Sequence, residues 1–300
     1  MKKILIGSVS AAALLMSVPS VAQVASVVDQ NGLSNDATVT QTGATGDTDS
    51  YITQDGTNNN AEVTQDGDNN NSTIEQTQDF LPGVNDPSNE ADVEQLGSNG
   101  DLTILQEGNN TADASQTAGS QNDDAFILQI GGVLGGENVA SLTQGGINQA
   151  AAIAQIGSGN DADISQFGEG TNPAIPTYDD FANNIADGAA IGQAGYGNTA
   201  SIAQNAGSRD GGSLIAQAGS DNEAHSEQSG EGAWSEIYQL GSDNFADVVQ
   251  DGDAESLVMQ DGSNNQAMVD QTGANLSTVN QTGDGNSANV TQAGGSPGAL

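Results

Sequence analysis

The amino-acid sequence predicts an all-β fold, a β-solenoid of about eleven two-strand rungs in which two parallel sheets face each other. Three observations lead to this prediction. A glutamine recurs at nearly regular spacing, the residues before it alternate between two kinds of side chain, and a glycine usually follows it. A rung here is one pair of consecutive strands with the turns that join them.

The repeat is marked by 22 glutamines, from Gln30 to Gln292. Twelve of the 21 intervals between them are 11 residues long, and nineteen of the glutamines are followed two residues later by Gly. Glycine supplies the positive φ that a tight turn needs, so each glutamine is expected near the end of a strand. The first strand is expected over 24–30 and the last over 286–292.

The residues before each glutamine follow a period of two. Val, Ile or Leu stands two residues earlier in 20 of 22 cases, Ala or Ser four residues earlier in 21, and Asn six residues earlier in 13. Alternate residues of a β-strand share one face, whereas a helix would scatter them around its circumference. These side chains are therefore predicted to point inward, and the mostly polar or acidic residues between them outward.

Stacked rungs would bring like side chains together, because Ser and Ala alternate at the small position and give a true repeat of about 22 residues. Eleven rungs at about 4.8 Å each make a stack of roughly 50 Å. Glutamine and asparagine amides would then satisfy one another in ladders along the axis. The ladder residues singled out are Gln41, Gln54, Gln65, Gln95, Gln155, Gln166, Gln193, Gln204, Gln239, Gln250, Gln271, Gln281, Gln292, Asn35, Asn59, Asn160, Asn198, Asn222, Asn244 and Asn286.

The N-terminal residues 1–22 have the pattern of a secretory signal peptide. A basic start is followed by an apolar stretch that is short for a membrane span, and then by Ser20-Val21-Ala22, a small-x-small cleavage site. Cleavage after Ala22 is expected. The repeats then occupy 23–294, with loop insertions near 77–88 and 167–187 that contain prolines, and 295–300 form a flexible tail. The insertions are either tolerated surface loops or contact surfaces.

The charge excludes several partners. The formal net charge is −37, and removal of the signal peptide would leave Arg209 as the only strong base against 40 acidic residues. Nucleic acid and anionic membrane surfaces are therefore not expected partners, and no membrane insertion is predicted. The chain has no cysteine. Repulsion between these acids predicts that any assembly accelerates with added salt, divalent cations or acid.

No catalytic, cofactor or metal site is predicted. The segment 195–200 imitates a dinucleotide-binding glycine fingerprint but falls in a solenoid turn, and 66–70 lacks the Gly and closing Glu of a calcium loop. Weak collective binding of cations by the aspartate-rich turns stays open. His225, the only histidine, is expected on the outward face without a group to orient it, and Trp234 is expected outward or in a turn.

The repeat resembles the curlin repeat, Q-x-G-x-G-N-x-A-x-x-x-Q. Residues 155–166, 193–204 and 281–292 match that pattern throughout, and looser copies cover nearly all of the predicted mature chain. The resemblance implies a subunit of curli-like amyloid fibres, exported through an outer-membrane channel to the surface of a Gram-negative bacterium. It implies self-assembly, other curli subunits as partners, and a role in adhesion and biofilm matrix.

The chain departs from the family in several ways, which include more repeats, more acidic residues and two long insertions. Ser lies four residues before the repeat glutamine instead of six, and the separate export segment between signal peptide and repeats is missing or reduced. Open sheet edges without a polar cap predict end-to-end addition into a fibre. The alternative is a soluble acidic β-solenoid that acts as a surface adhesin or cation-binding protein. The sequence has no regular Thr-x-Thr array, which argues against an ice-binding solenoid. It also gives no sign of the basic or metal-lined cleft that a lyase-like enzyme needs.

Overall fold

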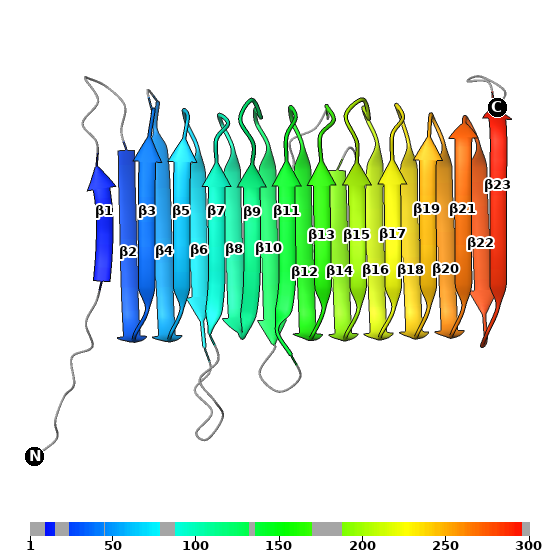
Figure 1. Cartoon of the computed structure of the whole chain (residues 1–300), viewed down its shortest axis with the longest axis horizontal. Coiled ribbons are helices and arrows are strands. Elements are labelled where there is room, and N and C mark those ends of the chain that lie inside the picture. Colours follow the sequence, from blue (N-terminus) through cyan, green and yellow to red (C-terminus); the bar gives the residue numbers. More distant parts are fainter. Residues whose placement is uncertain are drawn as a thin grey trace, which may run out of the picture.

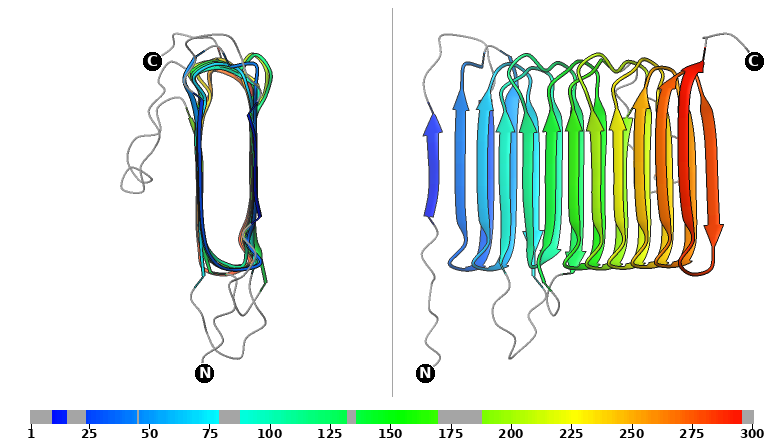
Figure 2. Two further views of the ribbon diagram at one scale, coloured as in Figure 1. Left: turned by 90° about the vertical axis from the view of Figure 1, so that its left-hand side faces the viewer. Right: turned by 45° about the vertical axis from the view of Figure 1, so that its right-hand side comes forward.

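The fold is that of a computed structural model, which describes residues 10–15, 24–44, 46–78, 88–131, 136–169 and 188–295. It confirms the predicted fold class, an all-β solenoid of two facing parallel sheets (Figure 1). Seen along its long axis, the chain winds around a flattened, elongated cross-section (Figure 2). Within the residues described, no helix has the length and apolar character needed to cross a membrane.

Consecutive strands alternate between the two sheets, so each sheet contains every second strand of the chain. The even sheet consists of β2 (Val24–Leu33), β4 (Thr48–Thr57), β6 (Asn71–Thr77), β8 (Asp101–Gly108), β10 (Asp124–Gly131), β12 (Ala150–Ser158), β14 (Gly188–Tyr196), β16 (Gly212–Ser220), β18 (Trp234–Ser242), β20 (Glu255–Ser263) and β22 (Leu276–Thr282). The odd sheet consists of β1 (Ser10–Leu15), β3 (Asp36–Thr42), β5 (Asn60–Asp66), β7 (Asn89–Gln95), β9 (Asn110–Gln116), β11 (Asn138–Gln144), β13 (Asp161–Gln166), β15 (Thr199–Gln204), β17 (Glu223–Gln228), β19 (Phe245–Asp251), β21 (Gln266–Gly273) and β23 (Ser287–Gly295).

The strands stack in register. Gln155 of β12 pairs with Gln129 of β10 on one side and with Gln193 of β14 on the other, although 38 residues separate Gln155 from Gln193. Each of β2 to β23 contains one of the repeat glutamines, so the predicted strands are the observed ones. The chain between a glutamine and the next strand varies in length, yet the ladder glutamines of successive rungs stay paired.

The core lies between the two sheets and is formed by the aliphatic and small positions of the repeat. Ile127, Ile153 and Ile191 are fully buried and lie one above another in the even sheet. Ser226 takes the aliphatic position in β17, and its hydroxyl accepts a hydrogen bond of 2.9 Å from the Ser213 hydroxyl of the facing sheet. The one serine at an aliphatic position of the repeat is therefore hydrogen-bonded to a serine of the facing sheet.

Most turns that follow the even strands contain a glycine that the close packing of the rungs requires. Gly157 has a φ of +122°, and a Cβ there would overlap the carbonyl oxygen of Gly195 in the next rung. The residue before most of the asparagines at the start of the odd strands also has positive φ, with Gly197, Asp221 and Asn264 at +64°, +54° and +57°. Glycine, aspartate and asparagine are the residues that tolerate this left-handed conformation, which explains the composition of the turns.

One strand was not predicted. β1 lies inside the segment interpreted as a signal peptide and pairs in parallel with β3, Ser10 beside Asp36 and Leu15 beside Gln41. Residues 1–9 and 16–23 lie outside the described residues, and removal of 1–22 stays a prediction. The proline-containing parts of both predicted insertions and the end of the tail (79–87, 170–187 and 296–300) also lie outside them.

Candidate functional site: side-chain ladders and the faces of the solenoid

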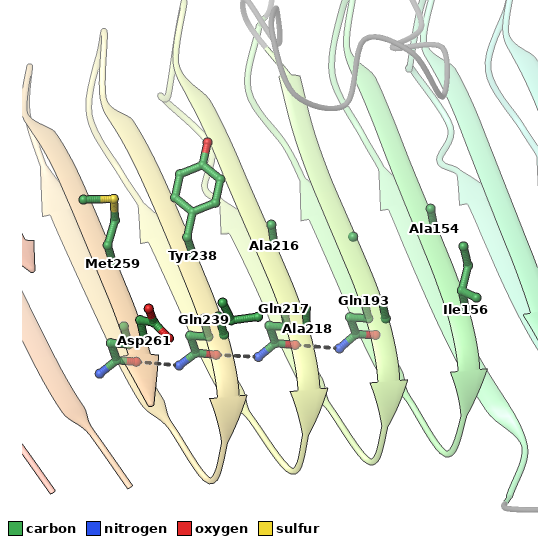
Figure 3. A pocket seen from close by; sticks show the side chains of 14 residues that line it. Ala154, Ile156, Gln193, Ala216, Gln217, Ala218, Tyr238, Gln239, Met259 and Asp261 are labelled. Carbon is green, nitrogen blue, oxygen red and sulfur yellow. Dashed lines mark hydrogen bonds between the residues drawn. The ribbon is translucent and has the colours of Figure 1, made fainter. Parts of the chain in front are cut away.

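A ladder of glutamines runs through the even sheet from end to end. The Nε2 of each glutamine donates to the Oε1 of the glutamine one rung later, at 2.7 to 3.0 Å. Figure 3 shows this ladder at Gln193, Gln217 and Gln239. The ladder comprises Gln30, Gln54, Gln76, Gln106, Gln129, Gln155, Gln193, Gln217, Gln239, Gln260 and Gln281.

The odd sheet contains a second glutamine ladder with the same direction. Its Nε2–Oε1 distances are 2.7 to 3.2 Å. The ladder comprises Gln41, Gln65, Gln95, Gln116, Gln144, Gln166, Gln204, Gln228, Gln250, Gln271 and Gln292.

Each buried amide is also tied to the facing sheet. Gln155 donates its second N–H to the carbonyl of Val139 at 2.8 Å, and Gln166 donates to the carbonyl of Ala150 at 3.3 Å. Gln155 and Gln166 are at most 1% exposed. An amide with two donors and an acceptor is thus satisfied within the stack, which is what burial of such a group requires.

The asparagine ladder belongs to the odd sheet alone and has the opposite direction. The Nδ2 of Asn286 donates to Asn265 Oδ1 one rung earlier at 2.8 Å, and Asn198 donates in the same way to Asn160 at 3.1 Å. The ladder comprises Asn35, Asn59, Asn89, Asn110, Asn138, Asn160, Asn198, Asn222, Asn244, Asn265 and Asn286. All the singled-out glutamines and asparagines therefore lie in three columns. The restriction of the asparagine ladder to one of the two sheets was not predicted.

The ladders leave unmatched groups at the two ends of the stack. Among the described residues, Gln30 Oε1 at the N-terminal end is buried and accepts no hydrogen bond. At the C-terminal end, Gln281 Nε2 donates to the carbonyl of Gln266 and Gln292 Nε2 to that of Leu276. Each of these two amides keeps a further N–H without an acceptor in the described part of the chain. The N-terminal end thus offers an acceptor where the C-terminal end offers donors.

In-register stacking also places like charges above one another. Asp101 and Asp124 are paired positions of β8 and β10. Burial, together with the charges of Asp101 and Asp123, raises the pKa of Asp124 to about 7, and burial raises the pKa of Asp123 to about 6. On the odd sheet, burial and the stacked charges of Asp113 and Glu62 raise the pKa of Asp92.

The Ser201 hydroxyl lies 2.7 Å from His225 Nδ1. Asp247 takes the paired position on the next strand, β19, so Ser, His and Asp follow one another along the odd sheet. This column lies on an open strand face, where the sheet ladder engages the backbone N–H groups that an oxyanion hole would need. No group of three or more metal-ligating side chains occurs among the described residues.

The outward side of the even sheet departs from the expected polar character between β12 and β20. We call this region the apolar face; it is formed by the outward side chains of the second halves of β12, β14, β16 and β18 and by Met259 of β20, and Asp261 of β20 lies at its edge. Ala154, Gly192 and Ala216 line a shallow hollow of about 600 Å³, and Tyr238 stands at its border (Figure 3). Leu240 is 55% exposed there. Deeper on the same side, Ala190 and Leu214 are buried in a small cluster against Tyr238.

One comparison with known proteins finds a match. The family model of the curlin associated repeat matches residues 51–77 and 135–168. Two segments of the chain are therefore similar to the curlin associated repeat. The first match covers the stack from β4 to β6, and the second covers β11 to β13, including the curlin repeat at 155–166. A search of curated proteins finds no match. The predicted resemblance to the curlin repeat is therefore confirmed, and the matched segments are strands of a β-solenoid.

Proposed function

We propose that this chain is a structural subunit of extracellular curli-like amyloid fibres that support adhesion and biofilm matrix. The role is structural and not catalytic. The observation that carries the proposal is the complementarity of the two ends of the solenoid. Curlin repeats support it, because they imply a subunit that assembles with copies of itself.

A second copy would continue each column when its N-terminal end meets the C-terminal end of the first. Gln281 Nε2 would donate to Gln30 Oε1 of the added copy, as each glutamine does to the next one within the chain. The edges of β22 and β23 would gain the backbone hydrogen bonds that open edges lack. Such a head-to-tail contact does not close on itself and so generates an open filament.

Removal of residues 1–22 fits this scheme. β1 occupies the edge of β3, which is the edge that an incoming β23 would use. We propose that this segment directs secretion and is removed before assembly. Export through an outer-membrane channel of a Gram-negative bacterium and contact with other curli subunits belong to the same proposal.

The experiment uses the chain from residue 23 onward and follows fibre growth by electron microscopy, thioflavin fluorescence and fibre diffraction. Fibres with a meridional spacing of about 4.8 Å are expected. Growth should be slowed by Gln292→Glu, because a carboxylate cannot donate to the next copy and would be buried unpaired. The expected loss is about 10- to 100-fold in elongation rate.

Thr291→Glu is the matched control, because it adds the same charge to the same strand on the outward side. It should elongate at close to the rate of the unsubstituted chain. A chain that stays monomeric under all conditions would contradict the proposal and favour a soluble acidic surface adhesin or cation-binding protein.

A further inference from the structure

The apolar face is out of place on this molecule. The chain has a net charge of −37, and its other outward strand positions are mostly polar or acidic. Across β12, β14 and β16 the outward residues of the second half of each strand are instead uncharged, with Ala154, Gly192 and Ala216 at the position before the ladder glutamine. Contiguous exposed apolar surface of this kind marks an interaction site.

Large side chains protrude from the apolar face on both sides of a shallow groove that small residues line. We call the large side chains knobs and the groove the trough. Ile156 and Leu240 are 39% and 55% exposed, and Ala194 and Ala218 lie between them on the intervening strands. Ile156 and Leu240 are three strand spacings apart, which corresponds to about 14 Å. The trough between them is two small residues wide, enough to receive one branched side chain from a facing surface.

We propose that the apolar face pairs laterally with the same face of a second copy, so that two solenoids lie side by side. A two-fold axis in the plane of the interface places Leu240 of each copy in the Ala194–Ala218 trough of the other. An isologous contact of this kind needs one surface that complements itself, and the knob and the trough provide it. The acidic surroundings repel a second copy everywhere else on the flanks.

The size of the face decides when pairing occurs. Five strands along the axis and two outward positions along each strand give roughly 300 Å² a copy, so a pair buries about 600 Å², below the ~1,000 Å² of a stable interface. Single chains are thus expected to pair weakly. In a fibre, which is the function proposed above, the face recurs in every copy, and many weak contacts act together. Lateral pairing is therefore a property of fibres.

The test compares Ala216→Glu with Ala203→Glu. Both residues precede a ladder glutamine and are half-buried, but Ala216 lies in the hollow of the even sheet and Ala203 on the odd sheet. Fibre width is measured by cryo-electron microscopy. The unsubstituted chain and Ala203→Glu should give filaments two solenoids wide, and Ala216→Glu filaments one solenoid wide at an unchanged elongation rate.

A second pair of variants guards against misfolding of the first. Leu240→Asn removes the knob from the apolar face, and Leu96→Asn removes a leucine from the same repeat position of the odd sheet. Only Leu240→Asn should narrow the fibres, and circular dichroism should be the same for all four variants. Filaments one solenoid wide in the unsubstituted chain, or paired filaments of Ala216→Glu, would overturn lateral pairing while leaving fibre formation intact.

If no fibres form, the proposed function fails and pairing is judged on soluble chains by sedimentation equilibrium at high concentration. Self-association that Ala216→Glu weakens at least about ten-fold and Ala203→Glu does not would support the face as an interface between copies. Absence of such self-association would overturn it, and would assign the hollow to another apolar ligand.

Discussion

At the scale of single residues, the inward column of the even sheet contains serines whose hydroxyls are buried without a hydrogen bond among the described residues. Ser50, Ser72, Ser235, Ser256 and Ser277 are at most 4% exposed, and their Oγ atoms have no hydrogen-bond partner within the described part of the chain. Alanine occupies the same column in the middle of the sheet. A buried hydroxyl without a partner costs free energy, so these positions are candidates for stabilisation.

We predict that Ser235→Ala raises the free energy of unfolding by about 1 kcal/mol, because it removes an unsatisfied hydroxyl and leaves almost no cavity. Thermal denaturation followed by circular dichroism measures this. Ser213→Ala is the matched variant in the same column and should have the opposite sign, since it deprives Ser226 of its only described partner. Destabilisation by both substitutions would contradict the argument.

The stacked aspartates of β8 and β10 predict a pH dependence. The pKa of Asp124 in the folded chain, about 7, lies above its ordinary value, so the folded state binds a proton that the unfolded state releases. Stability from this group is present below pH 4 and is lost as the pH rises through about 7. Asp124→Asn should therefore raise the free energy of unfolding at pH 8 by about 1 kcal/mol, a figure reduced for solvent screening. It should also weaken the decrease of that free energy between pH 5 and pH 8.

The measurement is urea denaturation at pH 5 and pH 8. Asp270→Asn removes one carboxylate from an exposed outward position of the odd sheet and serves as the control. It should change the stability equally little at both pH values. A variant Asp124→Asn whose stability still falls with pH as in the unsubstituted chain would refute the assignment.

At the scale of elements, the turns limit the sequence more strictly than the strands do. Gly157→Ala is predicted to destabilise the stack by more than 3 kcal/mol, because the added Cβ meets a carbonyl of the next rung and the φ of +122° is strained. Gly285→Asn is the control, since nothing lies near Gly285 and Asn264 holds the equivalent position with positive φ. Equal losses in thermal denaturation would count against the close approach as the cause.

The strands and their inward faces could be predicted from the sequence because a period of two fixes which residues share a face. Other features depend on neighbours that lie far apart along the chain. Ala154, Gly192 and Ala216 look like ordinary small residues in their own strands, and only the stack makes them one surface. The direction of each amide ladder depends on side-chain rotation, which spacing does not specify. The pairing of β1 with β3 joins an apolar segment to a repeat strand that it does not resemble in sequence.

At the scale of the whole molecule, repulsion between the acidic surfaces of two copies opposes the proposed end-to-end addition. Neighbouring copies in a fibre bring acidic surfaces within a few ångströms, and the Debye length falls from about 30 Å at 0.01 M salt to about 8 Å at physiological salt. Elongation seeded with preformed fibres is predicted to accelerate several-fold over this range. An equal osmolality of sucrose should give no such acceleration, and a rate indifferent to sodium chloride would reject the electrostatic barrier.

The amide columns point along the axis, glutamines one way and asparagines the other, and so the two tips of the rod are chemically unlike. A filament assembled from such rods has a plus and a minus tip, in the manner of a cytoskeletal polymer. The two-fold axis of the proposed lateral pair sets the two solenoids antiparallel, so the tips of a paired fibre are alike. In filaments one solenoid wide the growth speeds at the two tips would differ, and time-lapse images of a single Ala216→Glu seed would show one arm outgrowing the other.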